Sequence, residues 1–205
     1  MTRSFKHPGR PRLSDVTEPT SRVITRAAAR LFMDHGYSAV SMSMIAKEAN
    51  LTKASVYYHF KDKATLFTAA MKYILDQAYQ ATEQILASPV NVRGKLERIT
   101  RIVADFPQPF WVYDTMMHEA STELAREQEQ EIRQAEKRLY THIEKMFTEA
   151  VRNKEIRQLD PFLLTRVFVN ILRVVQLSST HERIKDKDAL AKQLIGIFWE
   201  GVGLN

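Results

Sequence analysis

Apolar residues recur three or four positions apart along most of the chain, and β-branched residues do not alternate with polar ones beyond residue 91. This spacing is typical of amphipathic helices, so the sequence predicts an all-α fold. Gly36, Asp62, Asp160 and the charged stretch KDKD at 185–188 mark helix boundaries, because such residues cap or end helices. About nine helices are expected, over 19–36, 42–49, 53–60, 63–88, 91–105, 109–119, 121–153, 160–179 and 187–203.

Residues 41–60 predict two short helices joined by a tight turn, the layout of a helix-turn-helix that reads DNA. Ser41 and Thr52 are good N-caps for the two helices. Asn50 is suited to the left-handed turn between them, because Asn tolerates a positive φ better than most residues with a side chain. The second helix carries two strongly apolar anchors, Val56 and Phe60, spaced to lie on the same face.

These two anchors determine which side chains of the second helix point outward. With about 100° of rotation per residue, burying Val56 and Phe60 leaves an opposite face of short or hydrogen-bonding side chains. That face consists of Ala54, Ser55, Tyr57 and Tyr58, with Lys53 and His59 on its flanks.

The run IAKEANLTKASVYYHFKDKATLF resembles the DNA-binding signature of TetR-type transcriptional repressors. It departs from that pattern at Asn50, where the family usually has Gly, and at Met44, where a polar residue is common. The resemblance implies a DNA-binding domain at 17–63 and a ligand-binding and dimerisation domain at 64–205. It also implies a homodimer on double-stranded palindromic operator DNA, usually released by a small-molecule effector.

We assign the expected DNA contacts by side-chain chemistry. Lys53 is the side chain most able to reach a guanine, and Ser55, Tyr57 and Tyr58 would approach base edges or the sugar-phosphate backbone. Ala54 lies on the same face. The recognition helix would be capped by Thr52, and phosphates would be held by Ser41, Ser43, His59 and Lys63.

Residues 1–16 combine basic residues with Pro and Gly and have no helical period, which indicates a flexible basic arm. The core of this arm, GRPR, looks like the minor-groove clamp of AT-hook peptides. Arg10 and Arg12 flank a proline that keeps the chain extended, a shape that suits a narrow A·T-rich groove. A disordered tail would have the same composition, so both interpretations stay open.

The positive charge is concentrated in the same region. The chain has 30 Lys and Arg against 24 Asp and Glu, and residues 1–63 hold 11 and 5 of them, so residues 64–205 are neutral. A basic N-terminal region favours a polyanionic partner, although an ordinary basic surface would look similar.

The eighth and ninth predicted helices carry apolar side chains on nearly every face, and such a helix must be covered on all sides. One side would face its own domain, and the other suits a two-fold four-helix interface with an identical chain. Burial of both helices in a monomer core is the alternative. The expected interface residues are Phe162, Val167, Ile171, Val174, Val175, Leu190, Leu194, Ile197, Phe198 and Val202.

Residues 105–120 concentrate aromatic side chains, methionines and a histidine around two prolines, a composition typical of a ligand pocket. Because the domain is neutral, we expect an effector that is largely apolar. An ordinary hydrophobic core would produce the same stripe. The candidate pocket residues are Ile99, Ile102, Val103, Phe106, Phe110, Trp111, Tyr113, Met116, Met117, His118, Ile143, Phe147 and Phe168.

Other function classes find little support in the sequence. GxSxG, GxxxxGK[ST], GxGxxG and HExxH are all absent, so no enzyme and no cofactor are expected. The chain has no Cys, no signal-peptide pattern and no apolar run long enough to span a membrane, which indicates a cytoplasmic protein without a membrane partner or a metal site. A DNA-binding protein of the same fold with a chromosome-organising or protein-partner role remains the main alternative.

Overall fold

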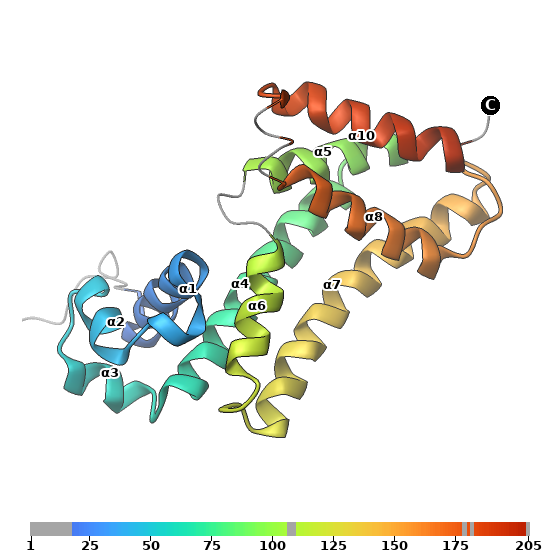
Figure 1. Cartoon of the computed structure of the whole chain (residues 1–205). Coiled ribbons are helices and arrows are strands. Elements are labelled where there is room, and N and C mark those ends of the chain that lie inside the picture. The colour runs from blue at the N-terminus through green and yellow to red at the C-terminus, as the bar shows by residue number, and fades with distance from the viewer. Residues whose placement is uncertain (1–17, 106–109, 178–179, 181–182, 204–205) are drawn as a thin grey trace, which may run out of the picture.

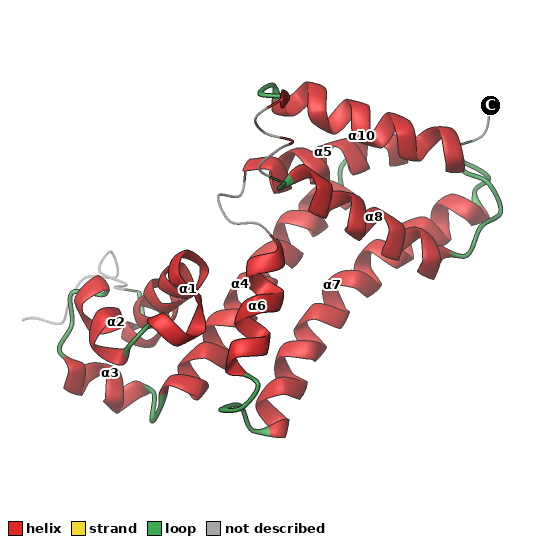
Figure 2. Cartoon of the chain, in the orientation of Figure 1, coloured by secondary structure: helices red, strands yellow, loops and turns green. Residues whose placement is uncertain are grey.

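The computed structural model describes residues 18–105, 110–177, 180 and 183–203. Over these ranges it contains nine helices and no strand beyond a β-bridge between Ile156 and Gly203, which confirms the all-α prediction (Figure 2). The helices are α1 (Thr20–Ala39), α2 (Met42–Glu48), α3 (Lys53–His59), α4 (Lys63–Leu86), α5 (Val92–Asp105), α6 (Phe110–Ala120), α7 (Arg126–Arg152), α8 (Pro161–Val175) and α10 (Lys187–Val202).

The long helix α4 connects two groups of helices (Figure 1). Helices α1, α2 and α3 gather at its N-terminal end, and α5, α8 and α10 lie at the other end, with α6 and α7 beside it. At 1.5 Å per residue, the 24 residues of α4 span about 36 Å. None of the described helices has the length and apolar content needed to cross a bilayer.

Two large hydrophobic cores hold these groups together. The first joins α1–α3 to the N-terminal half of α4 and also takes side chains from α6 and α7, including Met116 and Ile132. In the second, Phe147, Phe168 and Phe198 from α7, α8 and α10 meet with ring centroids 6.2 to 6.3 Å apart. The first core therefore includes residues beyond 63, because α4, α6 and α7 pack against the buried side of α1–α3.

Three helix boundaries differ from the sequence prediction by three residues or more, and one of them is the end of α8, which lies at Val175 where 179 was expected. Gly36 kinks α1 at φ 79° and ψ 173° without ending it, and the helix continues to Ala39. The expected helix over 121–153 begins only at Arg126, because residues 121–125 form a turn in which Ala120 O accepts hydrogen bonds from the N–H groups of Glu123 and Leu124.

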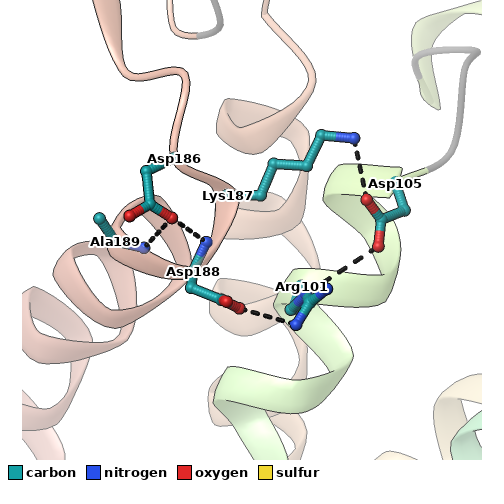
Figure 3. A network of polar contacts seen from close by, with 6 residues as sticks. All are labelled: Arg101, Asp105, Asp186, Lys187, Asp188 and Ala189. Atoms are coloured by element: carbon teal, nitrogen blue, oxygen red, sulfur yellow. Dashed lines mark hydrogen bonds and ion pairs between the residues drawn. The ribbon is translucent and has the colours of Figure 1, made fainter.

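A polar network connects the end of α5 to the start of α10 (Figure 3). Asp186 caps α10 by accepting from the N–H groups of Asp188 and Ala189, while Lys187 Nζ donates to Asp105 Oδ1 at 2.8 Å and Arg101 pairs with Asp188 at 3.0 Å. The hydrogen bond from Lys187 lowers the pKa of Asp105. Exposed ion pairs add little stability, so we infer that this network mainly sets where α10 begins.

The kink in α1 brings Tyr37 and Ser38 against the α6–α7 turn. Tyr37 is fully buried, and its hydroxyl donates to Glu123 Oε2 at 2.7 Å. The Ser38 N–H donates to Glu119 Oε2 at 2.8 Å, and Lys63 Nζ lies 4.1 Å from the centroid of the Tyr37 ring. We call these five residues the junction, because they join α1, the first turn of α4, and the end of α6.

The junction should make stability depend on pH. The Ser38 N–H lowers the pKa of the Glu119 carboxyl below its usual 4.5, so the stabilisation is present above about pH 4.5 and is lost as the pH falls through the folded-state pKa. We predict that Glu119→Gln is less stable than the wild type at pH 6 and that this difference shrinks at pH 3.5. Urea unfolding at both pH values measures the difference.

Glu149→Gln is the matched control for this experiment, because Glu149 is exposed on α7 and forms no ion pair within the described chain. A difference between wild type and Glu119→Gln that stayed constant from pH 6 to pH 3.5 would contradict the role assigned to Glu119.

Candidate nucleic-acid interface

The caps and the turn of the helix-turn-helix are those that the sequence predicts. Ser41 Oγ accepts from the Met44 N–H at 3.2 Å, and Thr52 Oγ1 accepts from the Ser55 N–H at 3.1 Å. Asn50 has a φ of 54° in the turn, the left-handed conformation expected for this position. Local hydrogen bonds therefore determine where α2 and α3 begin.

The roll of α3 also agrees with the prediction. Val56 is completely buried, and Phe60 packs half-buried against the same core. On the opposite face the Tyr58 side chain is 86% exposed and Tyr57 is 44% exposed. Thr52, Lys53, Ala54 and His59 are exposed as well, whereas Ser55 is half-buried.

The exposed side chains of α3 contact one another across the helix surface. Lys53 Nζ lies 5.8 Å from the centroid of the Tyr57 ring, and the rings of Tyr58 and His59 meet edge to face with centroids 5.1 Å apart. Ser41 and Ser43 of the preceding turn and helix are exposed too. The result is a short polar and aromatic surface beside the N-terminus of α3.

Lys63 does not belong to this exposed surface. Its ammonium donates to Ser38 O at 3.4 Å and covers the Tyr37 ring, and burial lowers its pKa although Glu123 and Glu119 lie nearby. Helical spacing alone could not predict that Lys63 contacts Ser38 and Tyr37 of its own chain. Lys61, which was not among the expected DNA contacts, lies directly after α3 with 79% of its side chain exposed.

The two arginines of the basic arm, Arg10 and Arg12, lie outside the described residues, so their expected minor-groove role stays a prediction.

The expected pocket residues fall into two separate places. Ile99, Val103, Ile143, Phe147 and Phe168 meet in the second core, whereas Tyr113, Met116 and Met117 pack in or against the first. Ile102 is 36% exposed and His118 is also exposed, so neither faces a common interior. Phe106 and the side chains of Phe110 and Trp111 lie outside the described residues. Among the described side chains of 105–120, Tyr113, Met116 and Met117 thus face the first core, because α6 packs against α1. The ligand pocket itself stays a prediction.

The expected interface residues divide between the surface and the interior. Phe162, Val167, Val174 and Ile197 are exposed, with Ile197 at 72%, and Ile171 and Leu194 are half-buried. Val175, Leu190, Phe198 and Val202 are buried in the chain's own cores, because they lie on the inner sides of α8 and α10. A groove of about 480 Å³ runs between the two helices and is lined by Leu163, Val167, Ile171, Leu194 and Ile197, among others.

Comparisons with known proteins agree with this architecture. The family model described as bacterial regulatory proteins, tetR family, matches residues 24–70, which include all of α2 and α3. The uncharacterized HTH-type transcriptional regulator YhgD of Bacillus subtilis is 21% identical over 73% of this chain and 78% of its own length.

Two solved structures share the fold. AibR, in complex with isovaleryl coenzyme A and operator DNA, has a TM-score of 0.68 at 26% identity, covering 87% of this chain and 97% of its own. FadR from Bacillus subtilis, in complex with stearoyl-CoA, has a TM-score of 0.67 at 20% identity, covering 88% and 98%. Together with the capped helix-turn-helix, the family match identifies residues 24–70 as a tetR-family domain, within a chain that has the fold of AibR and of the transcriptional regulator FadR.

Proposed function

We propose that the protein is a ligand-responsive repressor that binds a palindromic operator as a homodimer and is released by a largely apolar small molecule. The observation that carries the proposal is the exposed face of α3, which presents Lys53, Tyr57 and Tyr58 while Val56 is buried beneath it. A helix of this kind reads base edges in the major groove. The protein would act in the cytoplasm, by binding and without catalysis.

The proposed division of labour follows from side-chain chemistry and exposure. Lys53 would contact a guanine, and Ser55, Tyr57 and Tyr58 would contact base edges, thymine methyl groups or the backbone. Ser41, Ser43 and His59 would contact phosphates. Lys61 takes the phosphate role first expected of Lys63, because its ammonium is exposed and weakly paired with Asp62 at 3.8 Å.

Dimerisation through α8 and α10 is supported by the apolar surface that these helices expose. Leu163, Val167 and Ile197 are each more than half exposed and line one groove. Soluble monomers rarely expose large contiguous apolar patches, and an identical chain related by a two-fold axis would cover this one. Two helix-turn-helix units would then reach successive major grooves about 34 to 36 Å apart.

The domain organisation that we propose separates DNA binding at 17–63 from ligand binding and dimerisation at 64–205, with 1–16 as a basic arm. Helix α4 would transmit movement between them, because it contacts both cores. AibR and FadR were solved with acyl-CoA ligands, whose acyl groups are apolar although their coenzyme A part is charged, so they support an effector that presents an apolar group to the pocket. Ligand binding would change the separation of the two DNA-binding units, so that they no longer match the operator.

Two lysine variants test the proposed DNA contacts. Lys53→Ala should relax the preference at one or two base pairs, because the lost base contact is worth about 1–3 kcal/mol of discrimination. Lys61→Ala should weaken binding to all sequences and reduce the salt slope by about one unit, because one phosphate contact is lost. Fluorescence anisotropy on the selected operator and single-base variants, from low to physiological salt, measures both effects.

Lys192→Ala, at an exposed lysine on α10, should change neither quantity. If the Lys53 and Lys61 variants lost the same affinity on every sequence, the assigned base contact would be wrong.

A charge placed on the α8–α10 surface tests the dimer. Ile197→Glu should produce a folded monomer, because a desolvated carboxylate would be costly in an apolar interface. Sedimentation at micromolar concentration compares it with the wild type and with Lys192→Glu, which changes an exposed polar position of the same helix. A wild-type monomer, or an Ile197→Glu dimer of unchanged stability, would refute this interface.

A further inference from the structure

A second groove, of about 400 Å³, lies between α4 and α7, away from the α8–α10 surface. We call it the α4–α7 groove. Helix α4 contributes Tyr79, and α7 contributes Lys137, Arg138, Thr141, His142 and Lys145. Residues 137/138, 141/142 and 145 follow the three- and four-residue spacing of one helix face, so they line the groove in a row.

The groove is positively charged although residues 64–205 are neutral in sum. Three cations line it, and no carboxylate does. Arg138 pairs with Asp76 at 3.5 Å, but Lys137 and Lys145 have no carboxylate within 4.0 Å in the described part of the chain. Two unneutralised cations therefore remain in a concave site. A neutral total charge does not reveal this cluster, which forms because α7 places Lys137 and Lys145 eight residues apart on the same side as Arg138.

The aromatic side chains that line the groove contact one another, and one of them contains a polar atom without a hydrogen-bond partner among the described residues. The Tyr79 and His142 rings lie with centroids 4.8 Å apart, and the Arg138 guanidinium covers the Tyr79 ring at 4.0 Å from its centroid. His142 Nε2 is buried and has no hydrogen-bond partner within the described residues. Buried polar atoms are nearly always hydrogen-bonded, so an unpartnered ring nitrogen beneath a cationic groove favours a site built for a ligand.

We propose that the α4–α7 groove binds a small organic phosphate. The two unneutralised lysines match the charge of a phosphomonoester, about −1.5 to −2 at pH 7. Arg138 and the Thr141 hydroxyl supply further donors for its oxygens. The volume falls within the range of about 300–1,000 Å³ typical of small-molecule sites, so it accommodates an organic group beyond the phosphate.

This proposal goes beyond the repressor function and does not depend on it. The groove is built entirely from α4 and α7, and none of its residues belongs to the helix-turn-helix or to the α8–α10 surface. The bound ligand would bridge α4 and α7, the two helices that run side by side between the cores (Figure 1).

Calorimetric titration of the full chain, without DNA and at constant ionic strength, tests the site. The probes are AMP and glucose 6-phosphate, each compared with its unphosphorylated counterpart, adenosine or glucose. We expect at least one phosphate to bind one equivalent per chain, about tenfold or more tightly than its counterpart. The variant Lys137→Gln/Lys145→Gln should lose about tenfold or more of that affinity, because both unneutralised cations are removed.

Lys185→Gln/Lys192→Gln makes the same charge change at exposed lysines outside the groove and should bind like the wild type. Circular dichroism confirms that each variant keeps its helices. Failure of both phosphates to bind, equal binding of the unphosphorylated compounds, or equal losses in the two double variants would overturn the proposal. Because no DNA is present, each of these outcomes leaves the proposed repressor function untouched.

Discussion

The burial of Tyr37 is the constraint on which the rest of the structure depends. Its ring packs between Phe32 and Phe67, with centroids 5.8 and 4.9 Å away, in the centre of the first core. A buried phenol hydroxyl requires a hydrogen-bond partner, and Glu123 supplies it from the turn before α7. Burial, together with the hydrogen bond to Glu123, raises the pKa of Tyr37, so the phenol stays neutral. One aromatic side chain thus joins the helix-turn-helix to the α6–α7 turn.

The position of α4 follows from this junction. Lys63 lies over the Tyr37 ring at the first residue of α4, and Asp62 caps the same helix by accepting from the Thr65 N–H at 2.7 Å. The far end of α4 packs in the second core through Ile85. A displacement of α4 or α6 would therefore move residues that pack against the DNA-binding unit. The proposed coupling between ligand binding and DNA binding could act through these contacts, because the helices that would contact a ligand also pack against Tyr37.

Local features could be predicted from the sequence, whereas contacts between distant helices could not. Caps at Ser41, Thr52 and Asp62, and the turn at Asn50, depend on residues within four positions and were all expected. Helical period also identified the buried side of α3. Helical periodicity identifies the apolar face of a helix but does not show which other helix packs against that face. Met116 was therefore expected in a ligand pocket, whereas it packs in the first core. The α4–α7 groove was not predicted, because the net charge of residues 64–205 does not show where in space the charged side chains lie.

Selection of bound sequences from a pool of random duplex DNA is the most direct test of the central claim that the exposed face of α3 reads DNA from a two-fold dimer. The wild-type protein should enrich one motif made of two inverted half-sites whose centres are about one helical turn apart. A pool that stays random after several rounds, while the protein remains folded, would contradict the account.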